Sequence, residues 1–300
     1  MKQILFSYTG VIAAFLTIVF FTSYLNDQPL NKEPIGQQIK PVALGDTFDF
    51  AEEMLPMKNF DVRERLDREL LVNTYWHSST LLNLKKKSKY FPIIEPILSK
   101  YGIPDDFKYL SVAESNLSNA NSPAGAKGFW QLMSPTAKAY GLEITSGIDE
   151  RFNLEKATEA ACQYLLHYKE KFGSWTMAAA AYNLGATKMS EEIRNQKTNN
   201  YYEMNLNEET SRYIFRLVAI KEILTYPEKF GFYLTPEDVY PPLEPHYIDT
   251  IQNSIPSLAD YAQSKGITYR MLKVYNPWLL DSKLDNPNGK TFLIKLPQQD

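Results

Sequence analysis

The chain has 300 residues, 44% of them hydrophobic, and a formal net charge of −3 from 32 basic and 35 acidic side chains. This length suits one large or two smaller globular domains. The near balance of charges argues against a nucleic-acid-binding protein, which needs a basic face to neutralise phosphates. A single cysteine, Cys162, excludes an intramolecular disulfide. The three histidines lack metal-ligand spacing, so we expect neither a bound metal nor a cofactor.

The N-terminus carries an apolar run from Ile4 to Leu25 that follows Lys2 and contains no charged residue. About 20 apolar residues span a bilayer as a helix, and a preceding lysine favours a cytoplasmic N-terminus. Cleaved signal peptides have apolar cores of roughly 7–15 residues followed by a small-x-small site. This run is longer and ends in Thr-Ser-Tyr-Leu, so we expect an uncleaved membrane anchor over residues 4–25, with a cleaved signal peptide as the alternative. Either one exports the rest of the chain to the cell envelope or periplasm.

Apolar periodicity and proline content divide the chain into segments. Apolar residues at three- and four-residue steps recur at Leu66, Leu70 and Tyr75, as on one face of a helix. Helical patterns separated by turns follow, and three prolines near residue 241 mark a boundary. We expect a mainly α fold with a separate small module at the end. The expected segments are an anchor or signal peptide (1–25), a linker (26–50), a helical N-terminal extension (51–90), a helical domain (91–235) and the module (245–300).

Glu114 is the first candidate for catalysis. Gly102–Asp106 places a proline and two acidic residues at a helix start, and the turn-forming residues of Ser118–Gly128 end that helix. Glu114 is therefore expected in the last turn, among apolar neighbours, where desolvation and the helix dipole both raise its pKa. A carboxylic acid that keeps its proton near neutral pH suits the protonation of a glycosidic oxygen. On spacing alone, an exposed glutamate paired with a lysine is the more common arrangement.

Further motifs follow Glu114 in order. The glycines of the second motif permit close backbone approach and unusual dihedral angles. Trp130 offers a ring for stacking on a sugar, and Gln131 offers an amide for hydroxyl or acetamido groups. Each motif taken alone also fits an ordinary turn, helix cap or core position. The motifs are Glu114-Ser115, Ser122-Pro123-x-Gly125-x-x-Gly128-Phe129-Trp130-Gln131, Ala180-Ala181-Tyr182-Asn183-x-Gly185 and Glu209-Thr210-x-x-Tyr213-Ile214.

In this order the motifs resemble the soluble lytic transglycosylase domain, a relative of goose-type lysozymes, over about residues 91–232. The longer context resembles the membrane-bound lytic murein transglycosylase D group, although many relatives have methionine where this chain has Trp130. The resemblance implies a lysozyme-like helical catalytic domain that acts on the glycan strands of peptidoglycan. It implies Glu114 as the catalytic acid and base. It also implies substrate-binding roles for Ser115, Ser122, Gly128, Trp130, Gln131, Tyr182, Asn183 and Tyr213.

The chemistry implied by this resemblance is a lyase-type cut. Hydrolases usually need two carboxylates, and no second acid stands in a motif here. In the implied reaction, Glu114 protonates the oxygen between N-acetylmuramic acid and N-acetylglucosamine. The ionised carboxylate then takes the proton of the C6 hydroxyl, which closes a 1,6-anhydro ring. A lysozyme-type hydrolase and a non-catalytic wall-binding scaffold stand as alternatives.

The tail resembles a LysM peptidoglycan-binding module. This resemblance implies a small α+β module made of a strand, two short helices and a returning strand. The glycine-aspartate pair of the usual first turn is missing, and Asn253–Pro256 stands in its place. Glycan binding and a purely structural cap are therefore both open. The matching segments are Ser257–Ala262, Gly266–Thr268, Leu272, Tyr275–Pro277 and Phe292–Pro297.

Overall fold

The computed structural model describes residues 40–243 and 246–298. The expected membrane anchor at residues 4–25 lies outside these ranges, as does most of the expected linker. Among the helices within them, none has the length and apolar character needed to cross a membrane. Val42–Asp300 form one compact unit, to which the following description applies.

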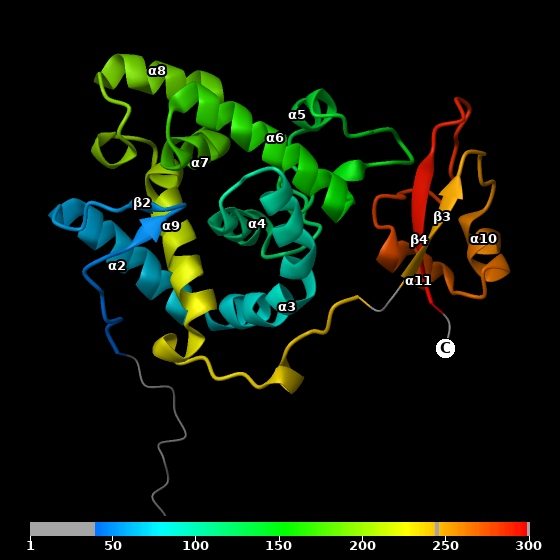
Figure 1. Ribbon diagram of the computed structural model, residues 1–300, viewed down its shortest axis with the longest axis horizontal. Coiled ribbons are helices and arrows are strands. Elements are labelled where there is room, and N and C mark those ends of the chain that lie inside the picture. Colours follow the sequence, from blue (N-terminus) through cyan, green and yellow to red (C-terminus); the bar gives the residue numbers. More distant parts are fainter. Residues whose placement is uncertain (1–39, 244–245, 299–300) are drawn as a thin grey trace, which may run out of the picture. The chain divides into compact units, whose positions relative to one another are not determined.

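Helices dominate this unit, so the mainly α fold class is confirmed (Figure 1). The described α-helices are α2 (Phe60–Tyr75), α3 (His77–Lys100), α4 (Lys108–Ser115), α5 (Ser134–Ala139), α6 (Leu154–Phe172), α7 (Trp175–Leu184), α8 (Ala186–Gln196), α9 (Glu208–Thr225), α10 (Leu258–Ser264) and α11 (Tyr269–Tyr275). The described strands form two antiparallel pairs, β1 (Asp49–Phe50) with β2 (Glu53–Met54) and β3 (His246–Ile251) with β4 (Phe292–Pro297).

The short helix α4 is packed between α3 and α9, while α7 packs against α6 and α9 (Figure 1). In α4, Leu110 and Val112 are almost fully buried, and Phe107 of the preceding 3-10 turn is completely buried. α7 supplies four consecutive buried alanines, which permit close approach of neighbouring helices. These contacts fix the end of α4 against the rest of the helical domain.

Local signals set several helix ends. Ser174 caps α7 by accepting a hydrogen bond from the Met177 N–H at 3.1 Å, and Gly173 ends α6 at a φ of +85°, as its glycine-serine sequence predicts. The sequence Ser134-Pro135 predicts Ser134 as a helix N-cap, but Met133 occupies the cap position of α5, one residue earlier.

The three lysines at 85–87 correct another expectation. A run of three lysines favours a solvated helix end, but this run lies in the middle of α3 and is half-buried. Lys86 donates to the carbonyl of Asn116 at 2.8 Å, and Lys87 donates to that of Leu224. Both carbonyls lie at helix C-termini, where lysines stabilise otherwise unpaired acceptors. These lysines therefore hold the ends of α4 and α9.

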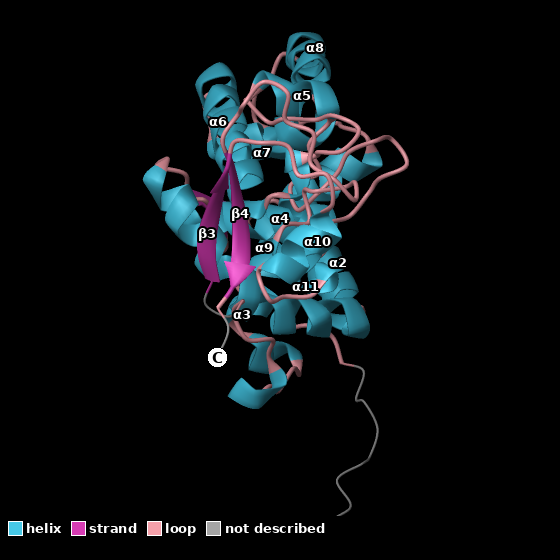
Figure 2. Cartoon of the chain, turned by 90° about the vertical axis from the view of Figure 1, so that its right-hand side faces the viewer, coloured by secondary structure: helices cyan, strands magenta, loops and turns pink. Residues whose placement is uncertain are grey.

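The tail module has the predicted order of strand, two helices and returning strand, with β3 and β4 side by side (Figure 2). Their register runs from His246 opposite Pro297 to Ile251 opposite Phe292. The small core of the module includes Leu258, Leu272 and Ile294. It also takes in Ile148 and Phe152 of the helical domain. The module therefore packs on the loop that precedes α6.

Candidate active site

Glu114 lies in the last turn of α4, as the sequence predicts. The helix ends abruptly after Ser115, because Asn116 and Leu117 both adopt left-handed conformations with φ of 50°. Asparagine adopts this conformation readily, whereas leucine does so at a cost. Leu117 is fully buried, which offsets that strain. The backbone after Glu114 is thereby turned sharply away from the helix axis.

Tyr213 of α9 donates its hydroxyl hydrogen to Oε1 of Glu114, across 99 residues of sequence. Burial raises the pKa of the Glu114 carboxyl, and the hydrogen bond from Tyr213 lowers it in part. The carboxylate of Glu209 raises this pKa further, while the guanidinium of Arg216 lowers it. The resulting pKa is about 7, against an ordinary value of 4.5. A group with this pKa both gives and takes a proton near neutral pH.

Tyr182 of α7 lies near enough to Glu114 to interact with its charge. Its hydroxyl donates to the carbonyl of Trp130 at 2.5 Å, which ties α7 to the loop that follows α4. Burial and the neighbouring Glu114 carboxylate hold the pKa of this phenol well above its usual value. Tyr182 and Tyr213 therefore remain neutral hydrogen-bond donors beside Glu114.

The loop between α4 and α5 is held by its own polar groups. The side-chain amide of Gln131 donates to the carbonyls of Ala120 at 3.1 Å and Gly128 at 2.8 Å. The hydroxyl of Ser122 accepts a hydrogen bond from the Ala126 N–H at 2.9 Å. The nitrogen of Gln131 is therefore used within the loop, and the substrate contacts expected of Ser122 and Gln131 stay predictions.

Gly128 is required where the loop meets the segment before α6. Its φ is +80°, and a Cβ at this position would lie 2.0 Å from the carbonyl oxygen of Arg151. Any side chain would displace that backbone. The sequence prediction of a close backbone approach is thus confirmed for Gly128, while its substrate contact stays a prediction.

Arg151 and Asp149 stand in none of the sequence motifs, and Asp149-Glu150 by itself favours only a turn before a helix. Arg151 is 4% exposed and donates to the carbonyls of Gly125 at 2.9 Å and Leu132 at 3.1 Å. Asp149 pairs with the same guanidinium at 2.8 Å. These bonds fix both ends of the loop that carries Gln131. The sequence signal that could have revealed this ion pair is an arginine two residues after an aspartate.

Two expected substrate contacts are wrong. The Trp130 side chain is completely buried, and its Nε1 donates to Oγ1 of Thr158 on α6 at 2.9 Å. A ring with no exposed face has no surface for a sugar, so Trp130 is a core residue. Ser115 is 5% exposed, and its hydroxyl donates to the carbonyl of Ser111 at 2.9 Å. Its hydroxyl stabilises the end of α4 and does not face solvent.

Asn183 connects α7 to the start of α9. Its Nδ2 donates to Oε1 of Glu209 at 3.0 Å, and its Oδ1 accepts from the Thr210 hydroxyl at 2.7 Å. Glu209 is exposed and interacts with Glu114 through its charge. The structure thus brings a second carboxylate near Glu114, which the sequence analysis did not anticipate.

No group of three or more His, Cys, Asp or Glu side chains suited to a metal ion occurs within residues 40–243 and 246–298.

Comparisons with known proteins find two matching family models and several relatives. Residues 92–205 match the Transglycosylase SLT domain, and residues 247–300 match the Soluble lytic transglycosylase C-terminal LysM-like domain. The chain is 28% identical over 250 residues to Membrane-bound lytic murein transglycosylase D of Escherichia coli strain K12. That alignment covers 80% of this chain and 53% of the relative. The chain therefore spans about half the length of the curated relative.

More distant similarities were also found. A Putative tributyltin chloride resistance protein from Alteromonas sp. strain M-1 is 28% identical over 125 residues, or 41% of this chain and 60% of that protein. The crystal structure of the 70 kDa soluble lytic transglycosylase of Escherichia coli aligns with a TM-score of 0.41 and 21% identity. This alignment covers 48% of the present chain and 26% of that structure.

Proposed function

We propose that this chain, which carries an SLT transglycosylase domain followed by a LysM-like C-terminal domain, is a lytic transglycosylase of peptidoglycan. The observation that carries the proposal is the pairing of Glu114 with Tyr213. It joins a carboxyl of pKa about 7 to a neutral donor at the end of a buried helix. A wall-binding scaffold has no need of such an acid.

The proposed reaction uses Glu114 twice. Its proton passes to the oxygen between N-acetylmuramic acid and N-acetylglucosamine, and that bond breaks as positive charge develops on the muramoyl ring. The carboxylate left behind, stabilised by the Tyr213 hydroxyl, then takes the proton of the C6 hydroxyl as its oxygen bonds to C1. Water is not consumed, and the product is a 1,6-anhydromuramoyl end. The attacking hydroxyl already belongs to the sugar, so proximity replaces an activated water.

A lysozyme-type hydrolase is the second candidate, and Glu209 is the observation that favours it. Two carboxylates are the usual equipment of a glycoside hydrolase, and Glu209 is exposed and near enough to raise the pKa of Glu114. Asn183 holds this carboxylate by one hydrogen bond at 3.0 Å.

Mass spectrometry of muropeptides released from purified sacculi separates the two candidates. A transglycosylase product is one water lighter than the corresponding hydrolase product, because the C6 hydroxyl closes onto C1. We expect mainly anhydro ends. Mainly reducing muramic acid ends would assign the protein to the hydrolases instead.

The proposed location is the cell envelope, with residues 4–25 as the anchor. An apolar span of this length binds through burial rather than charge, so association should survive high salt and alkaline wash and yield to detergent. Recovery of a soluble mature form that starts near residue 26 would favour a cleaved signal peptide.

A further inference from the structure

A cleft lies beside α4, between the helices that precede the matched SLT segment and α9. It has a volume of about 310 Å³ and takes its walls from α2, α3, α4 and α9. The lining residues of α2 and α3 precede residue 92, and those of α9 follow residue 205. Only its α4 wall therefore belongs to the matched segment. That wall includes Ala113, which is adjacent to Glu114 in the chain.

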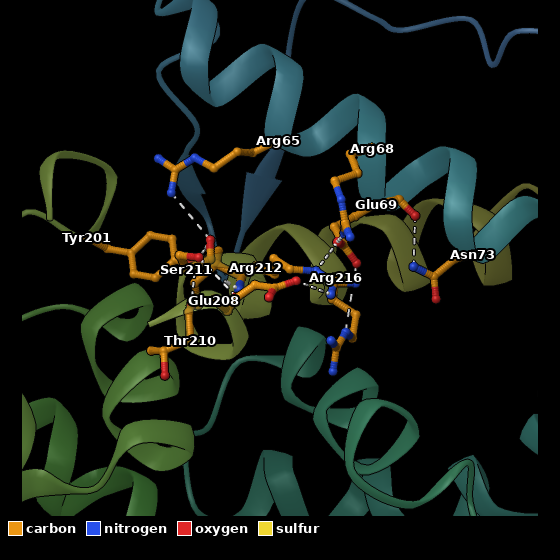
Figure 3. Close-up of polar contacts among 11 residues, drawn as sticks. Arg65, Arg68, Glu69, Asn73, Tyr201, Glu208, Thr210, Ser211, Arg212 and Arg216 are labelled. Atoms are coloured by element: carbon orange, nitrogen blue, oxygen red, sulfur yellow. Dashed lines mark hydrogen bonds and ion pairs between the residues drawn. The ribbon is translucent and has the colours of Figure 1, made fainter. Parts of the chain in front are cut away.

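One side of this cleft is built around a buried carboxylate. Glu69 of α2 is 1% exposed and accepts hydrogen bonds from Nη1 of Arg68 at 2.5 Å and Nε of Arg212 at 2.7 Å. Arg216 approaches the same carboxylate, but its Nε lies 3.8 Å away, beyond hydrogen-bond distance. Figure 3 shows these side chains of α2 and α9 meeting around Glu69. Three guanidinium groups thus share one buried carboxylate, with Glu208 as a further, exposed partner of Arg212.

Arg216 has N–H donors available for a ligand. A guanidinium carries five N–H donors in a planar fork, and within the described residues Arg216 donates none of them in a hydrogen bond. Its side chain is 26% exposed and lines the cleft. Carboxylates match such a fork with two parallel hydrogen bonds.

The other walls suit a peptide. Trp76, at the junction of α2 and α3, is 58% exposed and offers a flat apolar face at the cleft. The side chains of Asn73, Asn83 and Asn116 add amides, and apolar side chains of α4 and α9 complete the lining. A volume near 300 Å³ is at the lower end of pockets that hold small ligands, and it exceeds what a lone carboxylate needs.

We propose that this cleft binds the carboxylate-bearing stem peptide attached to the muramoyl residue of the substrate. Arg216 binds a peptide carboxylate, and Trp76 packs against the peptide. Glu69 acts through the arginines as a positioning residue, because it fixes the α9 side of the cleft. The inference rests on the proposed function, since it takes peptidoglycan as the substrate.

The test compares two substrates with the full chain. One is glycan strands that carry their stem peptides. The other is the same strands after an amidase has removed the peptides, which leaves a free lactyl carboxylate on each muramoyl residue. The variants are Arg216→Gln and Trp76→Ala, with Arg63→Gln as the matched control. Arg63 is a partly exposed arginine of α2 that pairs with Asp46 at 3.7 Å and does not line the cleft.

We expect Arg216→Gln to raise KM for peptide-bearing strands ten- to hundredfold, the range for a lost hydrogen bond to a charged group. The ratio of kcat/KM between the two substrates is the readout, because any effect of Arg216 on the pKa of Glu114 changes both substrates alike. Trp76→Ala should lower the same ratio by a smaller factor, and Arg63→Gln should leave it unchanged. Equal losses on both strands, or no loss on either, would overturn the proposal. Equal losses would also direct attention to the lactyl carboxylate.

Direct binding keeps this inference separable from the proposed function. Calorimetry with the free tripeptide L-alanyl-γ-D-glutamyl-meso-diaminopimelate needs no catalysis. Binding that Arg216→Gln weakens at least tenfold supports the subsite even if the product assay fails. Equal affinity in wild type and in both cleft variants would refute it even if the product is an anhydro sugar. Circular dichroism confirms that each variant is folded.

Discussion

Helix α9 contacts one carboxylate from α2 and one from α4, and its side chains are different partners for the two. Glu69 of α2 meets Arg212 and Arg216, and it is held in salt bridges. Glu114 of α4 meets Tyr213, a neutral donor, and its pKa rises to about 7. Glu69 is 1% exposed, whereas Glu114 is partly exposed. Their partners on α9 differ as well: guanidinium groups surround Glu69, whereas a neutral phenol donates to Glu114.

The largest effect expected from this difference is on catalysis. Glu114→Gln keeps the shape of the side chain but provides no acidic proton, and general acid–base terms are typically worth about 10²–10⁴-fold. We expect release of soluble muropeptides from sacculi to fall by that factor. The circular dichroism spectrum and co-sedimentation with sacculi should match those of the wild type. Turnover at the wild-type rate would remove Glu114 from the mechanism.

Glu69 should matter most for stability. Glu69→Ala leaves three arginines without the carboxylate that they share. Loss of one partner of a buried ion pair costs about 3–5 kcal/mol of stability. The arginines are partly exposed, so we expect a loss of about 3 kcal/mol in the free energy of unfolding, measured with urea.

The ion pair between Lys290 and Glu143, at 3.0 Å, is the matched control for Glu69. The Lys290 side chain is 55% exposed, so Lys290→Ala should change stability by less than about 0.5 kcal/mol. Similar losses in the two variants would mean that burial of Glu69 adds nothing to its ion pairs.

The stability effect of Glu114 should have the opposite sign to that of Glu69, and it should depend on pH. The folded-state pKa of about 7 lies above the ordinary value of 4.5. The raised pKa therefore stabilises the folded wild type fully below pH 4.5, and this stabilisation is lost as the pH rises through 7. Glu114→Gln has no such proton to lose. Its stability relative to the wild type should rise by up to about 3 kcal/mol between pH 4 and pH 8. A constant difference across this range would contradict the raised pKa.

The smaller of the two catalytic effects is expected at the partner of Glu114. Tyr213→Phe removes the hydrogen bond that lowers the pKa of Glu114, so this pKa should rise further, and the pH–rate profile should move to higher pH. The ionised carboxylate also loses its donor, and we expect turnover to fall about ten- to hundredfold. A profile that keeps its position would show that Tyr213 contributes packing alone.

Local sequence was enough for the elements and for part of the site. The last turn of α4 and the cap of α7 at Ser174 follow from patterns within a few residues, and both are confirmed. The order of the tail module, which the resemblance to LysM implies, is confirmed as well. The glycine required at position 128 was also anticipated, since a positive φ and a close approach both favour glycine.

Burial and distant partners were not available from those patterns. Trp130 lies in a motif that resembles a sugar-binding loop, yet Thr158, 28 residues later, provides the partner that makes it a core residue. Arg151 reaches back to the carbonyl of Gly125, a contact that exists only once the segment before α6 has folded against the loop. Local spacing reports neither contact.

The sequence by itself determined that this chain is mainly helical, that Glu114 ends a helix, and that a small α+β module follows the helical domain. Tertiary structure alone decided the chemical state of that glutamate. Tyr213 is 99 residues away, and Glu209 and Arg216 flank it on the same helix. A pKa depends on the burial and charges within a few ångströms, and it is the packing of α9 against α4 that brings those groups together.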